Sequence, residues 1–371
     1  MIRNKCVICE NYHFQNVFDI ISSIDFVSKE DFSPNEIETL NFIGCINCGC
    51  IQLQNLFNAD KIYEQPMTCF NGPCLNKHYE LFSDFIVKNK LYNNDVIFEI
   101  GGSYGRLAKL LINNYKNNNT QIKYCILELF TENYLPIENV EYISGNCETY
   151  EFKDVNTIIM SHVFEHLYEP RSFLKKISLS NVKEVFISIP DMESLTRIED
   201  INNLNIYHTF YIDTNFITYL FKEYNYELKN IYNYENNSMF YYFIKEQKTI
   251  TNMLIKNINL IDSQSKFYYN LKNKINKIKI DIPFYICPSG HYGRVVYYYL
   301  NENVKKNVLG FLDSDPMKID KRLCGTNCFN YKKEKIIMNK NFIVLIVSKK
   351  HTIELTDELL SYNDKTTFIY L

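Results

Sequence analysis

The sequence predicts an α/β protein with more than one domain. Two stretches have the pattern of a β-strand, a glycine-containing turn and an α-helix, one at residues 95–111 and one at residues 282–300. Two closely spaced pairs of cysteines precede the first stretch. The chain of 371 residues is longer than one typical domain, and its 46% hydrophobic residues suffice for substantial cores.

Charge and hydropathy argue against two classes of partner. The net charge of −3 lacks the basic excess of a nucleic-acid-binding protein. No apolar run reaches the roughly 18 residues that a membrane-spanning helix needs, and residues 1–6 lack the apolar core of a signal peptide. We therefore expect a cytoplasmic protein, with no membrane partner, whose 12 cysteines are reduced or bind a metal.

The first cysteines form two C-x-x-C pairs, Cys6 with Cys9 and Cys45 with Cys48. Four thiolates in this arrangement can occupy the corners of a tetrahedron around zinc. Such a site has no open position, so the zinc would stabilise the fold and would not catalyse a reaction. Cys50 is an alternative fourth ligand, and free buried thiols are the alternative to a metal site.

The first glycine turn is unusual for this chain. Gly101, Gly102 and Gly105 lie within five positions, although the whole sequence holds 11 glycines. The apolar run at residues 96–98 precedes them, and residues 107–111 follow with helical spacing. In this arrangement backbone N–H groups and a helix N-terminus can face a ligand. The alternative is an ordinary turn between a strand and a helix.

Glu128 ends the next predicted strand, within residues 121–130. A carboxylate at this place can accept hydrogen bonds from both hydroxyls of a ribose, in nicotinamide and in S-adenosylmethionine enzymes alike. The glycine order at residues 99–105 is E-x-G-x-x-x-G, which differs from the nicotinamide fingerprint G-x-G-x-x-G. The pattern favours S-adenosylmethionine. A surface carboxylate is the alternative for Glu128.

Further segments alternate in the same manner. We expect strands within residues 139–152, 155–170, 182–191, 307–316 and 341–348, and one or two helices within residues 245–279.

Several motifs together resemble one family. They are CVIC, CINCGCIQLQNLF, FEIGGSYG, SHVFEHL, IYHTFY, FYICPSGHYGRVVYYYL and VLGFLDSD. The chain resembles the three-part nucleotide-sugar C-methyltransferases, which belong to the class I S-adenosylmethionine-dependent methyltransferases. The resemblance implies a Rossmann-like methyltransferase core between a small zinc-binding domain and a smaller Rossmann-like α/β domain. The implied boundaries are 1–62 for the zinc-binding domain, 63–246 for the methyltransferase domain, 247–280 for a helical linker and 281–371 for the C-terminal domain.

The resemblance also implies which residues surround the cofactor. They come from the glycine turn, the ends of the following strands and the SHVFEHL motif: Glu99, Gly101, Gly102, Ser103, Gly105, Glu128, Leu129, Asn146, Cys147, Ser161, His162 and His166. Asn146 and Cys147 would flank the adenine. Without the resemblance, we would interpret His166 as a residue that starts a helix or packs in the core.

Methylation at a carbon beside a ketone needs a base for the α-proton and donors for the enolate. The family has tyrosine-histidine-glutamate-histidine where this chain has Tyr207-His208-Thr209 and then Phe210-Tyr211. A shift of two residues aligns His208 with the catalytic histidine and Tyr207 with the glutamate, which makes His208 the base, assisted by Tyr207 or Tyr211. Without the shift the acid–base positions are lost, and His208 would cap the following helix.

The segment 63–86 lines the cleft in the resembled family. Tyr63 and His78 are the matching positions here. The alternative for His78 is an ordinary surface histidine at the start of a helix.

The second glycine turn has two glycines where a nicotinamide fingerprint has three. By resemblance, Ser289, Gly290 and His291 would instead contact the substrate. The expected function is a methyltransferase for a nucleotide-linked sugar in glycan biosynthesis, with S-adenosylmethionine as cofactor and a structural zinc ion. The alternative is a non-catalytic scaffold or sugar-binding protein. A nucleic-acid methyltransferase is disfavoured by the acidic charge balance.

Overall fold

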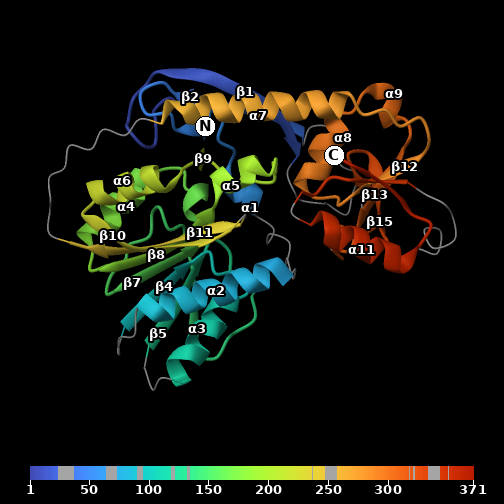
Figure 1. The fold of residues 1–371 in the computed structure, drawn as a ribbon. Helices are drawn as coiled ribbons and strands as arrows, with labels where there is room; N and C mark the ends of the chain where they lie inside the picture. The colour runs from blue at the N-terminus through green and yellow to red at the C-terminus, as the bar shows by residue number, and fades with distance from the viewer. Residues whose placement is uncertain are drawn as a thin grey trace. The chain divides into compact units, whose positions relative to one another are not determined.

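The computed structural model describes residues 1–23, 37–63, 73–89, 95–117, 122–131, 134–235, 237–246, 257–316, 318–320, 322–332, 343–349 and 351–371 (Figure 1). These residues form two compact units, each made of separate stretches of sequence. Unit 1 comprises Met1–Gln15, Gly44–Ser194 and His208–Ile258, and unit 2 comprises Asn16–Ile43, Leu195–Tyr207 and Asn259–Leu371.

Unit 1 is built on a seven-stranded sheet with the order β10-β11-β8-β7-β4-β5-β6. Its strands are β4 (Asp95–Ile100), β5 (Ile122–Glu128), β6 (Val140–Ser144), β7 (Thr157–Ser161), β8 (Glu184–Pro190), β10 (Tyr226–Tyr234) and β11 (Ser238–Lys245). Strands β4 to β8 are parallel, whereas β11 is antiparallel to both β8 and β10. The chain builds outward from β4 through β5 to β6, then returns to add β7 beside β4. This reversal makes the carboxyl ends of β4 and β7 the place where a ligand binds in such sheets.

Helices cover both faces of this sheet (Figure 1). They are α2 (Pro73–Asn89), α3 (Arg106–Asn117), α4 (Pro170–Leu179) and α6 (Thr214–Glu223). Unit 1 also contains the short helix α1 (Ala59–Tyr63) and the 3₁₀ turn η2 (Phe164–His166), and the short helix α5 (Met192–Arg197) crosses the division between the two units. Pro170 occupies the first turn of α4, where its missing N–H costs nothing. The Asp213 side chain caps α6 by accepting a hydrogen bond from the Phe216 N–H over 2.9 Å.

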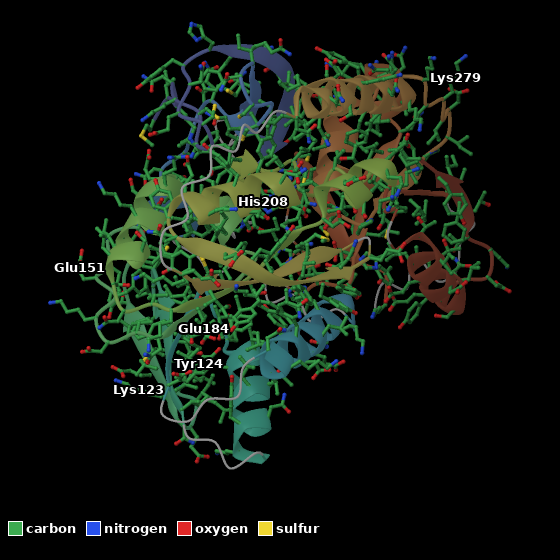
Figure 2. All side chains as sticks on the ribbon, turned by 60° about the vertical axis from the view of Figure 1, so that its left-hand side comes forward. Lys123, Tyr124, Glu151, Glu184, His208 and Lys279 are labelled. Carbon is green, nitrogen blue, oxygen red and sulfur yellow. The ribbon has the colours of Figure 1, made fainter. Side chains whose placement is uncertain are left out.

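One apolar core lies between the sheet and the pair α2 and α3. Phe82 and Ile86 of α2 and Leu107 and Leu111 of α3 are buried there. Tyr124, labelled in Figure 2, belongs to this core. The β8 strand is buried along its whole length, as expected for a strand covered on both faces.

Unit 2 contains a six-stranded sheet with the order β14-β15-β13-β12-β16-β17. The strands are β12 (Phe284–Cys287), β13 (Val308–Asp313), β14 (Arg322–Leu323), β15 (Thr326–Asn330), β16 (Ile343–Ile346) and β17 (Thr367–Tyr370). The helices are α7 (Ile258–Asn276), α8 (His291–Tyr299), α9 (Glu302–Lys305) and α11 (Thr352–Tyr362). All pairings in this sheet except β14 with β15 are parallel, which confirms a second α/β unit.

Three further strands come from the first part of the chain. They are β1 (Phe14–Ser23), β2 (Ile37–Cys45) and β3 (Ile51–Leu53), and within unit 1 β3 pairs antiparallel with β9 (Phe210–Tyr211). The expected α/β class and the predicted strands are confirmed. The boundaries of the four predicted segments stay predictions. No helix among the described residues is both long and apolar enough to cross a membrane.

Candidate functional site

The four cysteines predicted as ligands lie together. Cys6, Cys9, Cys45 and Cys48 place their Sγ atoms within 4.8 Å of one another. The Sγ atoms of Cys6 and Cys48 are 3.6 Å apart, and those of Cys9 and Cys45 are 3.5 Å apart. A tetrahedron with zinc–sulfur bonds of about 2.3 Å would place its sulfurs about 3.8 Å apart. The cluster can therefore hold a metal ion with little adjustment.

Cys50, the alternative ligand, lies outside this cluster. Its thiol is directed to two backbone carbonyl oxygens, of Ile51 at 3.6 Å and of Tyr211 at 3.9 Å. The structure therefore favours Cys48 over Cys50 as the fourth ligand.

The glycine turn after β4 is a tight backbone cradle. Gly101 and Gly105 have φ angles of +71° and +64°, a region that side chains disfavour. A Cβ atom on Gly101 would lie 2.5 Å from Val163 Cγ2, and one on Gly102 would lie 2.8 Å from Glu99 Cδ. The positive φ angles and these close contacts explain why glycine stands at positions of this turn.

Glu128 stands beside this turn at the end of β5. Its Oε1 accepts a hydrogen bond from the Ser103 N–H over 2.5 Å. The side chain is half-buried, and burial raises the pKa of Glu128 to about 7 in spite of hydrogen bonds from the backbone. It is therefore a carboxylate held beside the glycine turn at the carboxyl end of β5 and not a freely solvated surface acid.

Glu99 lies deeper, under the same turn. It is 2% exposed and accepts a hydrogen bond from the Tyr124 hydroxyl over 2.8 Å. Burial raises the pKa of Glu99 to about 7, although the Tyr124 hydroxyl opposes the shift. A cation bound at the turn would favour the ionised form of this carboxyl group.

The turn after β6 lies next to the end of β5. The Gly145 N–H donates to the Glu128 carbonyl oxygen over 2.7 Å, and Ser144 Oγ donates to the Leu129 carbonyl oxygen over 3.0 Å. The Asn146 side chain accepts from the Glu148 N–H over 2.8 Å and so shapes the turn. Cys147 is half-buried, and burial raises the pKa of its thiol to about 12.

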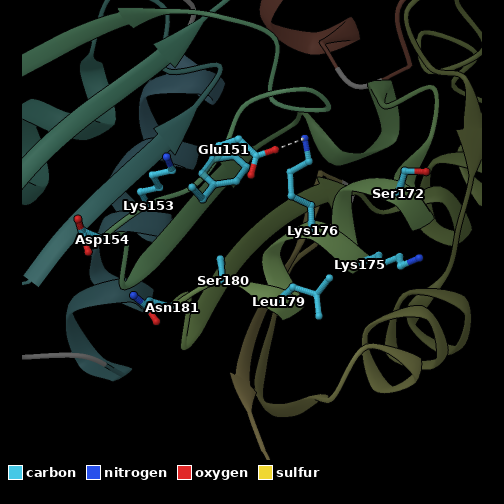
Figure 3. Close-up of a pocket in the computed structure, with 10 residues that line it drawn as sticks. Glu151, Lys153, Asp154, Ser172, Lys175, Lys176, Leu179, Ser180 and Asn181 are labelled. Atoms are coloured by element: carbon cyan, nitrogen blue, oxygen red, sulfur yellow. Dashed lines mark ion pairs between the residues drawn. The ribbon is translucent and has the colours of Figure 1, made fainter.

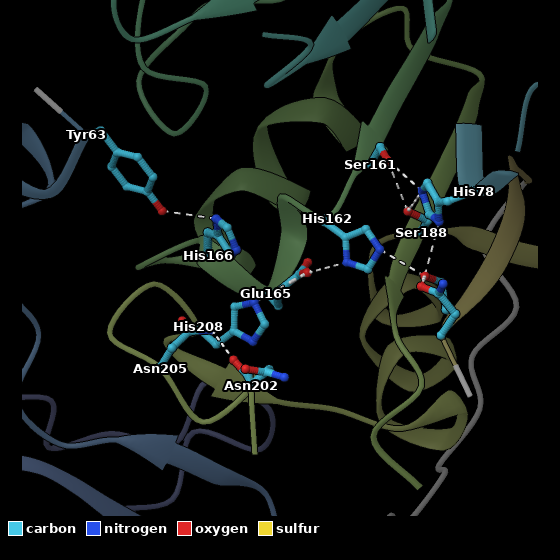
Figure 4. A network of polar contacts seen from close by, with 12 residues as sticks. Tyr63, His78, Ser161, His162, Glu165, His166, Ser188, Asn202, Asn205 and His208 are labelled. Atoms are coloured by element: carbon cyan, nitrogen blue, oxygen red, sulfur yellow. Dashed lines mark hydrogen bonds and ion pairs between the residues drawn. The ribbon is translucent and has the colours of Figure 1, made fainter. Parts of the chain in front are cut away.

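A buried polar network follows the ends of β7 and β8 (Figure 4). His78 Nε2 lies 3.0 Å from Ser161 Oγ and 3.3 Å from Ser188 Oγ. Ser238 Oγ lies between two histidines, 3.2 Å from His78 Nδ1 and 2.9 Å from His162 Nε2. His78 is 1% exposed, so it is not the surface histidine that was the alternative.

His162 has a backbone φ of +54°, which is uncommon for a residue other than glycine. Its N–H donates to the Ser188 carbonyl oxygen over 3.0 Å, which holds this conformation in place. Strained backbone of this kind clusters at functional sites.

Glu165 connects this network to a second group of side chains. Its Oε1 is 3.2 Å from His162 Nδ1 and 4.0 Å from His208 Nε2. Burial opposes ionisation of Glu165, but the hydrogen bond from His162 and the neighbouring histidines lower its pKa to about 2. His166 and His208 have ring centroids 5.0 Å apart, and His166 Nδ1 is 3.0 Å from the Tyr63 hydroxyl. Burial lowers the pKa of His166 against the pull of Glu165.

The predicted His208 therefore lies with other titratable groups. It does not cap the following helix, because Asp213 fills that position. Tyr211 lies in β9, with its ring centroid 6.3 Å from that of His208. Tyr207 belongs to unit 2, where it is 3% exposed and burial raises the pKa of its phenol.

The predicted substrate turn lies in unit 2, between β12 and α8. Both Ser289 Oγ and the Ser289 N–H donate to Asp313 Oδ2, over 2.5 and 3.1 Å. His291 is 7% exposed, and its Nε2 lies 2.8 Å from the Leu204 carbonyl oxygen. Gly290 begins α8, and a Cβ there would meet no atom within 4 Å. The side chains of Ser289 and His291 are thus engaged in hydrogen-bond contacts within unit 2, whereas the space beside Gly290 is open.

A surface hollow of about 670 Å³ lies elsewhere in unit 1 (Figure 3). It is bordered by residues 151–154, which lead into the amino end of β7, and by residues 179–181, which lead toward the amino end of β8. The glycine turn and the histidines lie at the opposite, carboxyl ends of the strands. The hollow is therefore separate from the candidate site.

Sequence reasoning missed three residues of the network, namely Glu165, Ser188 and Ser238. Glu165 stands in the quoted SHVFEHL motif, next to His166. Ser188 is a polar residue within the otherwise apolar run of β8, which is a usable signal. Ser238 begins β11, and nothing local in the sequence distinguishes it.

Solved methyltransferase structures resemble about half of the chain. Magnesium protoporphyrin IX methyltransferase from Synechocystis PCC 6803 with bound SAH is 11% identical, and 46% of this chain aligns with 84% of that chain at a TM-score of 0.37. A SAM dependent methyltransferase from Aquifex aeolicus is 16% identical, with 51% of this chain on 100% of that chain and a TM-score of 0.37. Human N-acetylserotonin methyltransferase in complex with SAM is 12% identical, with 47% of this chain on 54% of that chain and a TM-score of 0.37.

No model of a known protein family matches the sequence. No curated protein matches it either. The identities to the solved structures are too low to transfer substrates or residue roles to this chain.

Proposed function

We propose that the protein is a methyltransferase that uses S-adenosylmethionine. The observation that carries this proposal is the pairing of the glycine turn after β4 with Glu128 at the carboxyl end of the neighbouring strand β5. The backbone of residues 101–105 can approach the methionine part of the cofactor, and the Glu128 carboxylate can accept hydrogen bonds from the ribose hydroxyls. When bound, the cofactor supplies an activated methyl group on a sulfonium.

The turn also distinguishes this cofactor from a dinucleotide. A pyrophosphate requires the G-x-G-x-x-G spacing, in which the second glycine permits close approach of the phosphates. This chain has Ser103 at that position, with a φ of +48° and its N–H already donating to Glu128. The arrangement favours a ligand with a ribose but no pyrophosphate.

For the substrate we propose a nucleotide-linked sugar, methylated beside a ketone or on oxygen. The support is the resemblance of the motifs to the nucleotide-sugar C-methyltransferases, together with the second α/β unit. With the shift that makes His208 the base, Tyr207 stands where that family has its glutamate, and without it Thr209 does. Thr209 is 1% exposed, and its hydroxyl donates to the Leu167 carbonyl oxygen over 2.5 Å. Thr209 therefore has a structural role.

A carboxylate reaches His208 from another element instead. Glu165 of η2 lies 4.0 Å from His208 Nε2 and can stabilise the imidazolium that forms when His208 accepts an α-proton. Tyr63, which contacts His166, adds a phenol that can donate a hydrogen bond. The missing glutamate had suggested a non-catalytic scaffold. The carboxylate of Glu165 near His208 favours an enzyme instead. We also propose that zinc occupies the four-cysteine cluster and stabilises the fold.

The test is calorimetric titration of the zinc-loaded protein with S-adenosylhomocysteine. We expect micromolar affinity for the wild type and its loss in Glu128→Ala. A folded wild type that does not bind the compound would contradict the proposal and favour the scaffold. The C-methylation version predicts exchange of the α-proton of a bound 4-keto sugar in D₂O with enzyme alone, and no exchange would exclude that version.

A further inference from the structure

Three side chains of unit 1 form a second candidate metal site. Glu165 and His166 come from η2, and His208 comes from the segment before β9. Each offers one ligand atom, and these atoms lie within 4.8 Å of one another. Glu165 and His208 are 3% and 8% exposed. We propose that Glu165, His166 and His208 bind one divalent transition-metal ion.

The carboxylate of Glu165 gives a second reason to expect a cation here, independent of the distances between the ligand atoms. Its Oε1 is engaged by His162 Nδ1 at 3.2 Å. Its Oε2 is buried and has no hydrogen-bond partner among the described residues. A buried carboxylate oxygen without a partner is costly, and buried charges in proteins are normally paired or coordinate a metal. A cation at this oxygen would satisfy it.

The surroundings match those of metal ligands in proteins. A ligating histidine usually uses its other ring nitrogen for a hydrogen bond that fixes the ring, and a ligating carboxylate is itself hydrogen-bonded. Here Tyr63 holds His166 through Nδ1, which assigns the opposite nitrogen, Nε2, to the metal. His162 holds Glu165 in the same manner. Figure 4 shows His166 between Tyr63 on one side and Glu165 with His208 on the other.

The donor set indicates the class of metal. Two imidazoles and one carboxylate suit zinc, iron(II) and related first-row ions, whereas magnesium and calcium prefer oxygen ligands alone. Metal–ligand bonds of about 2.1 Å would place the donors roughly 3 to 3.5 Å apart, so donors at the limit of 4.8 Å must close by about 1.5 Å. Rotations of the side chains can supply that movement. Three protein ligands leave open positions for an oxygen atom of a substrate.

This inference goes beyond the proposed function and does not depend on it. A bound metal would take the Nε2 lone pair of His208, so His208 would then be a ligand and not the base, whereas cofactor binding at the glycine turn would be unaffected. Metal bound here would act as a Lewis acid on a carbonyl or hydroxyl oxygen. The presence of the metal can be measured without cofactor or substrate.

The experiment is a titration of the metal-depleted full-length chain with cobalt(II), followed by absorption spectroscopy. Cobalt bound by four thiolates shows an intense sulfur-to-metal charge-transfer band in the near ultraviolet. Cobalt bound by nitrogen and oxygen shows only weaker visible bands. We expect two cobalt ions per wild-type chain, and one per chain in Glu165→Gln and in His208→Gln. Both variants should retain the charge-transfer band, which also reports that they are folded.

Two further variants complete the design. Cys9→Ser should lose the charge-transfer band and keep the visible bands. His351→Ala is a matched control, because His351 is an exposed histidine 3.2 Å from the carboxylate of Glu354. It should bind two cobalt ions. A folded wild type that binds one cobalt ion, with a purely thiolate spectrum, would overturn the inference. Affinity for S-adenosylhomocysteine, measured separately, would leave the proposed function intact in that case.

Discussion

The Ser103 N–H and Glu128 Oε1 are joined by a hydrogen bond of 2.5 Å, which ties the glycine turn after β4 to the end of β5. The bond uses one oxygen of a carboxyl group whose pKa burial raises to about 7. The protonation of Glu128 therefore changes within the physiological range, and any ligand that this carboxylate accepts is sensitive to pH.

Affinity for S-adenosylhomocysteine should rise between pH 6 and pH 8. Below about pH 7 Glu128 gains a proton and loses acceptor capacity toward the ribose hydroxyls, so affinity should fall by up to about tenfold per pH unit. The measurement is calorimetric titration at several pH values. Glu128→Gln is the control, and it should bind weakly with little dependence on pH. Equal pH slopes in the wild type and the variant would show that Glu128 is not the group responsible.

Gly101→Ala should destabilise the protein and abolish cofactor binding. The positive φ costs a side chain about 1 to 2 kcal/mol, and contact with Val163 at 2.5 Å adds to this cost. Urea unfolding measures the first effect and calorimetry the second. Gly290→Ser is the matched control, since its Cβ meets nothing within 4 Å and serine is favoured at a helix N-cap. Its free energy of unfolding should change by less than about 0.5 kcal/mol. Similar losses in both variants would contradict the argument.

Glu99→Gln should stabilise the protein at high pH. Burial raises the pKa of Glu99 to about 7 from an unfolded value of 4.5, so the folded protein retains a proton that the unfolded chain has released. The contribution of the protonated Glu99 to the free energy of unfolding is therefore fully present below pH 4.5. It decreases as the pH rises toward 7, by about 1.4 kcal/mol per pH unit. Glutamine cannot ionise, which removes this dependence.

Urea unfolding at pH 5, 6, 7 and 8 checks this prediction. The variant and the wild type should have similar free energies of unfolding at pH 5, and the variant should be more stable at pH 8 by on the order of 1 to 3 kcal/mol. The Tyr124 hydroxyl can donate to the amide oxygen of glutamine as it does to Glu99. A constant difference across the pH range would refute the assignment.

Cys9→Ser should lose one equivalent of zinc per chain. A structural zinc site contributes directly to folding, so the variant should also unfold at a lower temperature. Elemental analysis of the purified protein measures the metal. Cys50→Ser is the control, because Cys50 is fully buried yet lies outside the cluster. The Cys50→Ser variant should keep its zinc even if the serine weakens the packing around this position. Loss of zinc from Cys50→Ser alone would assign the fourth ligand to Cys50.

Local patterns were sufficient for part of this structure. The apolar runs before Gly101 and Glu128 predicted strands, and the spacing of Cys6, Cys9, Cys45 and Cys48 predicted their convergence. Each of these signals depends on a few neighbouring residues. For this reason they could be recognised without any knowledge of tertiary contacts.

The histidine network could not be predicted in this manner. His78, Ser188 and Ser238 meet only because α2, β8 and β11 pack together, and no local signal marks that meeting. Glu165 was missed because an acidic residue in a short helical turn is usually solvated. Its burial and its proximity to His208 arise from the docking of two segments that are distant in sequence. Pairwise tertiary contacts, not local propensity, define this part of the site.

The place of β11 in the sheet has a consequence for synthesis of the protein. The parallel strands β4 to β8 can associate as soon as they leave the ribosome, but β11 pairs with β8 only after residue 245 has been made. Until then β8, an apolar strand, presents an unpaired edge that can recruit other nascent chains. During the same interval His78 and His162 lack the Ser238 hydroxyl that lies between them. A chaperone that shields this edge would therefore protect both the solubility of the nascent chain and the assembly of its polar network.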